Sequence, residues 1–258
     1  MANNYISIVM PAYNAEKTIE DSIKSVINQS YSDFELIIID DCSTDSTSRI
    51  IERIAKEDSR IAFYKNPKNS GVSNTRNRAI SLAKGEWIAF LDSDDLWAKN
   101  KLEKQLTFIR NIPDAVLSYT SSRFIDADNK IYSFEMHAKY KIAFKELLKR
   151  NLISCSSVIV KADVIKNIKM PGDYMHEDYY TWLTLLKKYK FAYGLDLPLL
   201  TYRLSNNSKS SSRFKSAVMI FRTYEAIGFN KIVSFGFTLF YSIHSFSKRI
   251  HFLFSDKS

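Results

Sequence analysis

The sequence predicts an α/β fold, in which a mostly parallel sheet is flanked by helices and followed by a C-terminal amphipathic helical tail. Stretches with strand character and stretches with helix character alternate along the first 110 residues, and this order favours parallel strands joined by right-handed crossovers. Three of the expected strands end in polar residues, at 13–14, 40–41 and 92–95. Because the carboxyl ends of parallel strands meet at one edge of a sheet, the three endings together indicate a ligand crevice there.

Local patterns in the first half of the chain support each element. Short apolar runs, rich in β-branched or aromatic residues, predict buried strands at residues 5–10, 35–39, 61–64 and 87–91. Apolar residues at helical spacing, preceded by capping or turn residues, predict helices over 16–29, after Asp45 and after Gly71.

The second half is expected to add further helices and strands to the same layers. The same signals predict a helix from Leu96 to about Arg110, a strand at 115–119, a helix near 144–151, a strand at 156–160 and a helix at 179–189. The polar stretch before Tyr140 is expected to be irregular, and residues 191–204 to form two short strands around Leu197-Pro198.

The most informative stretch runs from Gly85 to Asp95, where an apolar strand ends in the three carboxylates Asp92, Asp94 and Asp95. Like charges this close raise each other's pKa unless a positive group lies among them. Carboxylates suit Mg²⁺ or Mn²⁺, which in proteins often share their coordination with substrate phosphates. One alternative stays open, namely that these acids cap the helix expected from Leu96; one Asp can cap while another binds metal.

Composition excludes several classes of protein. Two cysteines, Cys42 and Cys155, predict a reducing compartment and no disulfide framework. The N-terminus leads straight into a strand without a basic and apolar leader, so a cytoplasmic protein is expected. Most of the net charge of +9 lies in residues 205–258, where eight Lys or Arg accompany two acids. A nucleic-acid-binding protein more often spreads its basic residues along the folded domain, so no nucleic-acid partner is expected.

The tail changes character from Ser205 onward. Residues 206–213 are polar, and residues 232–246 are strongly apolar and aromatic, although 15 residues are fewer than the roughly 20 that a membrane-spanning helix needs. Basic residues at Lys231, Lys248 and Arg249 flank this run, which is typical of a helix that lies in the interface of an anionic membrane. Alternatively, its aromatic residues pack on the protein's own core or against a second copy in a homodimer.

Five motifs occur in order at compatible spacings. They are Val9-Met10-Pro11-Ala12-Tyr13-Asn14, the run from Asp40 to Thr47, Asn69-Ser70-Gly71 with Thr75-Arg76-Asn77, Asp92-Ser93-Asp94-Asp95, and Glu177-Asp178 with Trp182. With these motifs, residues 5–206 resemble the inverting family 2 glycosyltransferases of GT-A fold, of the type that builds bacterial surface polysaccharides. Cys42 stands at a position of the second motif that varies within that family.

The resemblance implies a donor site at the crevice. Tyr13, in a loop with Pro11 and Asn14, would stack on the nucleotide base, and Asp41 or Asp40 would accept a hydrogen bond from that base. In the same way Arg76 would meet the phosphate or sugar of the donor, and Asp92 the ribose or sugar hydroxyls.

The resemblance also implies the reacting groups. Asp94, and next to it Asp95, would hold Mn²⁺ or Mg²⁺, which acts as a Lewis acid on the departing diphosphate. Asp178 would be the catalytic base, because inversion needs a carboxylate on the face of the sugar opposite the leaving group. On residues alone, Glu177 and Asp178 are equally well explained as first-turn acids of a helix.

The sequence therefore predicts a GT-A domain over residues 1–206, with a nucleotide-binding half at about 1–112 and an acceptor-binding half at about 113–206, and a membrane-associating tail over 207–258. The expected function is transfer of a sugar from a nucleotide-diphosphate donor to a glycan acceptor. The expected donor is a UDP-sugar, and the expected acceptor is lipid-linked or part of a surface polysaccharide. The reaction is expected to take place at the inner face of the cell membrane. Two alternatives are a non-catalytic nucleotide-sugar or glycan-binding module and a sugar nucleotidyltransferase. The second would need a Gly-rich phosphate loop near the first strand, which Pro11-Ala12-Tyr13-Asn14 is not.

Overall fold

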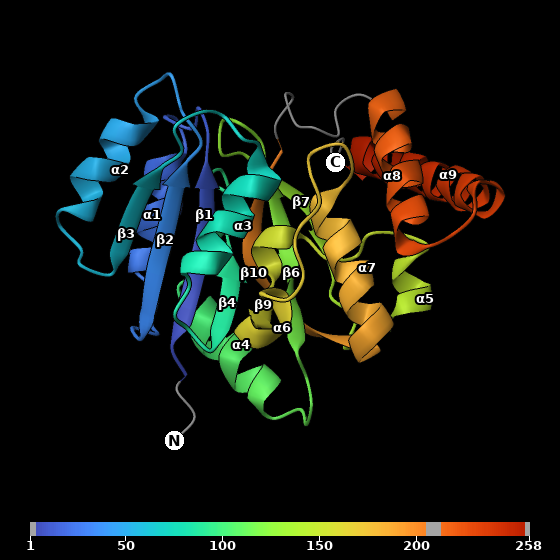
Figure 1. Cartoon of the computed structure of the whole chain (residues 1–258), viewed down its shortest axis with the longest axis horizontal. Helices are drawn as coiled ribbons and strands as arrows, with labels where there is room; N and C mark the ends of the chain where they lie inside the picture. The colour runs from blue at the N-terminus through green and yellow to red at the C-terminus, as the bar shows by residue number, and fades with distance from the viewer. Residues whose placement is uncertain (1–3, 205–212, 256–258) are drawn as a thin grey trace.

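The structure, a computed structural model, describes residues 4–204 and 213–255. Within these ranges ten strands form one sheet, whose main path runs β3-β2-β1-β4-β9-β6-β10-β5, while β7 pairs with β6 and β8 with β10 (Figure 1). The strands are β1 Ile6–Ala12, β2 Phe34–Asp40, β3 Ile61–Lys65, β4 Trp87–Phe90, β5 Leu96–Trp97, β6 Leu117–Ile125, β7 Ile131–Met136, β8 Lys141–Ala143, β9 Ile159–Lys161 and β10 Phe191–Arg203. The helices are α1 Ile19–Ile27, α2 Thr47–Ala55, α3 Val72–Leu82, α4 Lys101–Arg110, α5 Phe144–Leu147, α6 Ala162–Ile165, α7 Glu177–Tyr189, α8 Arg213–Ile227 and α9 Lys231–Ser255.

The predicted parallel order is confirmed for the first four strands along the path. β1 pairs in parallel with β2 and β4, and β2 in parallel with β3. The register places Ala12 beside Asp40 and Val9 beside Phe90. The polar residues after β1, β2 and β4 therefore emerge at one edge of the sheet, as the sequence predicts.

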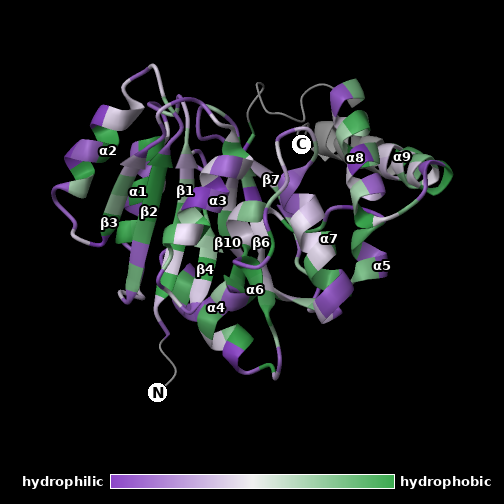
Figure 2. Ribbon diagram, viewed as in Figure 1, coloured by the Kyte–Doolittle hydropathy of each residue, from purple (hydrophilic) through white to green (hydrophobic). Residues whose placement is uncertain are grey.

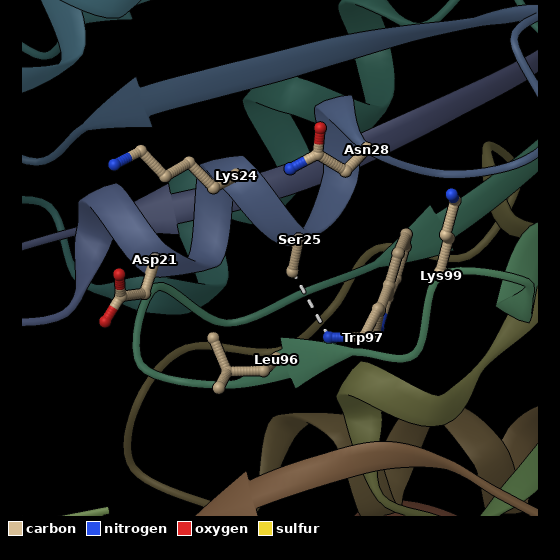
Figure 3. A pocket seen from close by; sticks show the side chains of 7 residues that line it. All are labelled: Asp21, Lys24, Ser25, Asn28, Leu96, Trp97 and Lys99. Carbon is tan, nitrogen blue, oxygen red and sulfur yellow. Dashed lines mark hydrogen bonds between the residues drawn. The ribbon is translucent and has the colours of Figure 1, made fainter.

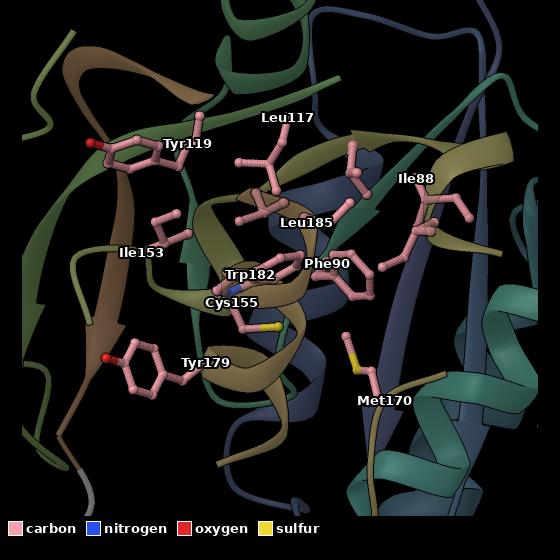
Figure 4. Packing of buried hydrophobic residues seen from close by; sticks show 14 of the residues in the cluster. Ile88, Phe90, Leu117, Tyr119, Ile153, Cys155, Met170, Tyr179, Trp182 and Leu185 are labelled. Carbon is pink, nitrogen blue, oxygen red and sulfur yellow. The ribbon is translucent and has the colours of Figure 1, made fainter. Parts of the chain in front are cut away.

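Alternation along these strands gives the sheet two apolar faces. Ile8, Met10 and Leu36 pack on one face with α1, α2 and α4, whereas Val9, Ile37 and Phe90 pack on the other with α3 and α7. Figure 2 shows hydrophobic colour along the central strands and hydrophilic residues on the outer surfaces of the covering helices. On the second face Phe90 and Trp182 meet edge to face, with ring centroids 5.7 Å apart, and Cys155 lies beside them (Figure 4).

The second half differs from the prediction in several places. The helix predicted near 144–151 ends at Leu147, and the strand predicted at 156–160 begins only at Ile159, after a 3-10 turn at Cys155–Ser157. Residues 191–203 form one long strand, in which the pairing with β6 is irregular around Pro198 because proline has no N–H to donate. The stretch expected to be irregular contains the strand β7. Leu96 and Trp97 pair with β10 as β5, so α4 begins later than predicted, at Lys101. A further helix, α8, precedes α9.

The helix α9 of the tail has one packed side and one exposed side. One side of α9 packs on the protein, since Phe237 lies 5.4 Å from Tyr224 and Tyr241 lies 5.7 Å from Tyr179, between ring centroids. A stripe on the opposite side, at helical spacing, is exposed to solvent and comprises Ile232, Phe235, Leu239 and Ile243. Among the described helices, none combines the length and the apolar character that crossing a membrane requires. Most of the polar stretch 206–213 lies outside the described residues.

Candidate active site

The acidic turn after β4 is held in place from two directions. The Leu91 N–H still bonds to the Val9 carbonyl, so the sheet ladder continues one residue past β4. The Asp92 N–H then donates to Ser156 Oγ at 3.0 Å, and the Asp95 N–H returns to the Asp92 carbonyl at 3.2 Å. A tight turn thus presents the predicted acids at the edge where β1 and β2 also end.

Arg203, the last residue of β10, fixes the far side of this turn. Its N–H donates to Asp95 Oδ1 at 2.9 Å, and its guanidinium Nε donates to the Asp94 carbonyl at 2.9 Å. Asp95 is buried, at 1% exposure, whereas Asp94 lies closer to solvent. Of the two acids predicted to hold metal, Asp94 is therefore the better placed to meet a ligand from outside. No single-residue pattern identifies Arg203 in the sequence, because its partners lie about a hundred positions away.

The electrostatics of the turn fit a cation. Burial, and after it the charge of Asp92, raises the pKa of Asp94 to about 6. Burial, followed by the charges of Asp94 and Asp92, raises the pKa of Asp95 well above its usual range. Oxygen donors of this kind suit a hard divalent ion, which would restore the ionised carboxylates. Within residues 4–204 and 213–255 no three His, Cys, Asp or Glu side chains form a ready-made metal cage.

Asp178 lies in the first turn of α7. Its Oδ1 accepts the Tyr179 N–H at 2.7 Å. Burial raises the pKa of Asp178 to about 6, and the charge of Glu177 adds to that rise, while Arg76 and the Tyr179 N–H act against it. A carboxyl with a pKa near neutrality accepts a proton readily and still ionises at physiological pH, which are the requirements for a general base.

Tyr202 on β10 lies within electrostatic reach of both this carboxylate and the acidic turn. Burial raises the pKa of its phenol, and the charges of Asp95, Asp92, Asp94 and Asp178 raise it further, in that order. Four carboxylates from two distant segments therefore lie near enough to one side chain to oppose its ionisation. Sequence reasoning missed Tyr202, because a tyrosine within a strand is ordinarily a core residue.

Arg76 lies between the two acidic segments. Its guanidinium donates to Asp92 through one terminal nitrogen and to Glu177 Oε1, at 2.8 Å, through the other. The side chain is buried, at 4% exposure, and the neighbouring carboxylates raise its pKa well above the usual range against the opposing effect of burial. The sequence predicts a donor contact for Arg76; in this structure both of its terminal nitrogens bind protein carboxylates.

The loops after β1 and β2 are joined by polar contacts. Tyr13 is half exposed, at 50%, and Asn14 next to it has a positive φ of 47° and accepts the Thr44 N–H at 2.9 Å. Pro11 lies within the buried β1. An open aromatic ring at the strand-end edge suits stacking on a nucleotide base.

Asp40 and Asp41 are buried at this edge and already accept hydrogen bonds from the protein. Asp40 accepts the hydroxyls of Ser43 and Ser48. Asp41 accepts the N–H groups of Ser70 and Gly71, together with Asn66 Nδ2 and Ser70 Oγ. These donors lower the pKa of Asp41 against the effect of burial. A hydrogen bond from the nucleotide base of the donor would share a carboxylate oxygen with one of these hydrogen-bond donors or displace it.

An open hollow of ≈ 350 Å³ lies elsewhere, between α1 and β5 (Figure 3). Asp21, Lys24 and Trp97 are among the residues that line it. The backbone N–H of Trp97 donates to Oγ of Ser25, another lining residue, at 3.2 Å. None of the predicted site residues lines this hollow, so it is separate from the carboxylates described above.

The sequence profile described as "Glycosyl transferase family 2" matches residues 7–168. The chain belongs to this family. It is a glycosyltransferase, which sets aside the binding module and the nucleotidyltransferase. The chain is 39% identical over 229 residues (88% of this chain and 90% of the relative) to TuaG of Bacillus subtilis (strain 168), whose name assigns it to teichuronic acid biosynthesis. It is 38% identical over 220 residues (83% of each) to WfgD of Escherichia coli, named as a UDP-Glc:alpha-D-GlcNAc-diphosphoundecaprenol beta-1,3-glucosyltransferase.

Solved structures share the GT-A fold of this family 2 enzyme. The S. aureus protein TarS 1–349, in complex with UDP-GlcNAc, superposes with a TM-score of 0.70 at 20% identity, over 89% of this chain and 69% of that one. The mannosyltransferase PcManGT of Pyrobaculum calidifontis, in complex with GDP-Man and Mn²⁺, gives 0.68 at 17% identity, over 88% and 65%. The predicted fold class is thereby confirmed, and a divalent metal is in keeping with this fold.

Proposed function

We propose that the enzyme transfers a sugar from a UDP-linked donor, with inversion at the anomeric carbon, to a hydroxyl of a lipid-linked saccharide in the synthesis of a surface polysaccharide. The names of the relatives support this substrate class, since one acts on an undecaprenyl-diphosphate acceptor and another is assigned to teichuronic acid. The proximity of Asp178 and the acidic turn is the observation that carries the proposal: Arg76 binds both Asp92 of that turn and Glu177, the residue next to Asp178.

In this mechanism Asp178 and the acidic turn have separate roles. Asp178 accepts the proton of the acceptor hydroxyl as that oxygen attacks the anomeric carbon. The Asp94 carboxylate, with Asp95 behind it, would hold Mn²⁺ or Mg²⁺, and such an ion stabilises the charge on the departing diphosphate as a Lewis acid. Because a departing diphosphate needs no proton from the protein, one carboxyl base would suffice where a glycosidase needs two carboxyl groups.

The donor's nucleoside is proposed to lie over the loops after β1 and β2. Tyr13 supplies a stacking surface, Asn14 shapes the loop that carries it, and Pro11 lies just before that loop in β1. Asp40 and Asp41 are proposed to act partly through the backbone of these loops, since their carboxylates bind Ser43, Ser70 and Gly71. Asp92 is proposed to meet ribose or sugar hydroxyls, because it retains 29% side-chain exposure beside Arg76.

We further propose that the enzyme works at the inner face of the membrane, with the exposed stripe of α9 in the lipid interface. Ile232, at 85% exposure, and Phe235, at 65%, lead this stripe. Apolar side chains of this kind gain about 1.5–3 kcal/mol each when fully removed from water. The net positive charge of residues 205–258 favours anionic lipid, and the lipid-linked acceptor would be held in the same plane. A homodimer that covers this stripe instead is the alternative outcome.

A panel of nucleotide sugars tests the proposal. Purified enzyme with Mn²⁺ is offered UDP-Glc, UDP-GlcNAc, UDP-Gal and GDP-Man, with a synthetic polyprenyl-diphosphate saccharide as acceptor, and the released nucleotide diphosphate is measured. The proposal expects turnover with a UDP sugar, dependence on Mn²⁺, and a product of opposite anomeric configuration by NMR. Retention of configuration, or preference for GDP-Man, would refute it.

A further inference from the structure

One polar face of α3 contacts the whole segment that leads to Asp178. Ser73, Arg76 and Asn77 are spaced three and four residues apart, so they lie on the same side of the helix. Each of them binds a different part of residues 170–177, a stretch that runs from Met170 through a loop into the first turn of α7. From the sequence, α3 is expected only to contact the donor, through Arg76.

The first attachment is a pair of reciprocal hydrogen bonds. Asn77 Nδ2 donates to the Met170 carbonyl at 2.9 Å, and the Met170 N–H donates to Asn77 Oδ1 at 3.0 Å. A side-chain amide that binds both groups of one backbone residue fixes its orientation as well as its distance. The start of the loop is thereby tied to α3.

The second attachment is at the N-terminus of α3. The Asp173 carboxylate accepts the N–H of Val72 and of Ser73, each at 3.2 Å, and the Ser73 hydroxyl at 2.9 Å. Gly71 leaves room for it, because a Cβ at this position would lie 2.2 Å from Asp173 Oδ2. A negative side chain at the positive end of a helix is stabilised by the unpaired N–H groups there.

The third attachment is the buried ion pair between Arg76 and Glu177, which also reaches Asp92 at the acidic turn. It ends one residue before Asp178. Three successive attachments, at residues 170, 173 and 177, thus run along α3 towards the carboxylate, and the last of them joins the donor side directly to the acceptor side.

We propose that this face of α3 is a clamp that positions Asp178 relative to the donor. The inference rests on the proposed role of Asp178 as base. Ser73 and Asn77 are positioning residues, because their polar groups bind the segment 170–173 and act on the reaction only through it. A displacement of about 1 Å in a reacting group lowers the rate by up to about 10²-fold, so loosening the clamp lowers turnover without weakening the donor complex.

Two matched substitutions on the same helix test the clamp. Asn77→Ala removes both bonds to Met170, whereas Asn74→Ala removes an exposed amide that donates to the Ser70 carbonyl and not to the segment 170–173. For each variant we would measure kcat and KM with the best donor of the panel, the affinity for UDP with Mn²⁺ by calorimetry, thermal unfolding, and hydrogen exchange of the amides in 170–178. The expected result for Asn77→Ala is a fall in kcat of about tenfold, UDP affinity within twofold of the wild type, and faster exchange in 170–178. Asn74→Ala should leave all of these unchanged.

Several outcomes would overturn the proposal. A fall in UDP affinity that matches the fall in kcat would make this face a donor ligand. Unchanged kcat, or unchanged exchange in 170–178, would remove the positioning role. Failure of the base assignment is recognised separately: Asp178→Asn would then retain turnover, whereas the exchange of 170–178 in Asn77→Ala reports the clamp without any reaction. Asp173→Asn, which weakens a second attachment, should reproduce the kcat effect of Asn77→Ala if the clamp acts as one unit, and a normal kcat would contradict it.

Discussion

Acidification is expected to switch the enzyme off through Asp178. Burial and the neighbouring charge of Glu177 raise the pKa of this carboxyl to about 6, and only its ionised form can accept a proton from the acceptor. At pH 5 about one molecule in ten would carry the ionised base, and at pH 4 about one in a hundred. A plot of log kcat/KM against pH should therefore fall with unit slope below about 6.

The metal site must be kept from contributing to this profile. The pKa of Asp94 is also raised to about 6, so the assay is run at saturating Mn²⁺, which holds that carboxylate in its ionised form. Unfolding through Asp178 does not imitate the effect. Its folded-state pKa lies above the ordinary value of 3.8, so its protonation between pH 6 and pH 4 stabilises the folded state.

A pair of substitutions decides whether Asp178 causes the fall in log kcat/KM at low pH, which we call the acid limb. Glu177→Gln removes a charge that raises the pKa of Asp178 and also frees Arg76 to lower it, so the limb should move to lower pH. Glu57→Gln, at an exposed position in the turn after α2, should leave it in place. A limb that does not respond to Glu177→Gln, or no limb between pH 5 and pH 7, would refute the reasoning.

Three further predictions concern the turn, the metal and the tail. Gly71→Ala should destabilise the fold by roughly 1–3 kcal/mol in urea unfolding, because φ is +84° and the new Cβ meets Asp173. The control Gly236→Ala, in open space on α9, should be neutral or stabilising. Equal changes in the free energy of unfolding for the two variants would contradict this. Asp94→Asn should raise the Mn²⁺ concentration for half-maximal activity at least about tenfold, since a neutral amide is a weaker ligand for a hard ion, whereas Asp178→Asn should leave Mn²⁺-supported UDP binding unchanged. Phe235→Ser with Leu239→Ser should abolish sedimentation with phosphatidylglycerol vesicles, and Ile131→Ser, at another exposed apolar position, should not; unchanged sedimentation of the double variant would place membrane binding elsewhere.

Elements whose signal is local could be predicted from the sequence. The apolar run of β4 ends in acids at the expected place, and the register of β1 with β2 brings Asp40 to the same edge. Periodicity identifies α1, because one stripe of apolar residues, including Ile19 and Ile23, is enough to bury it. Motif order gives the family, since five weak signals at compatible spacings constrain one another.

The rest depends on contacts between segments far apart in the chain. Arg203 holds the acidic turn through the Asp95 carboxylate and the Asp94 carbonyl, and no pattern near residue 203 reveals this. The sequence predicts two strands in place of β10 because Pro198 interrupts the pattern, but pairing with β6 resumes beyond the proline. Ser73 and Asn77 resemble ordinary solvated residues of a helix until Met170 and Asp173 are seen beside them.

The most direct test of the central claim compares transfer and donor binding in Asp178→Asn. The substitution keeps the size of the side chain and removes only the proton acceptor. Transfer is expected to fall by at least about 10²-fold, while calorimetry should give the wild-type affinity for UDP with Mn²⁺. Retained transfer, or a loss of UDP affinity equal to the loss of turnover, would contradict it.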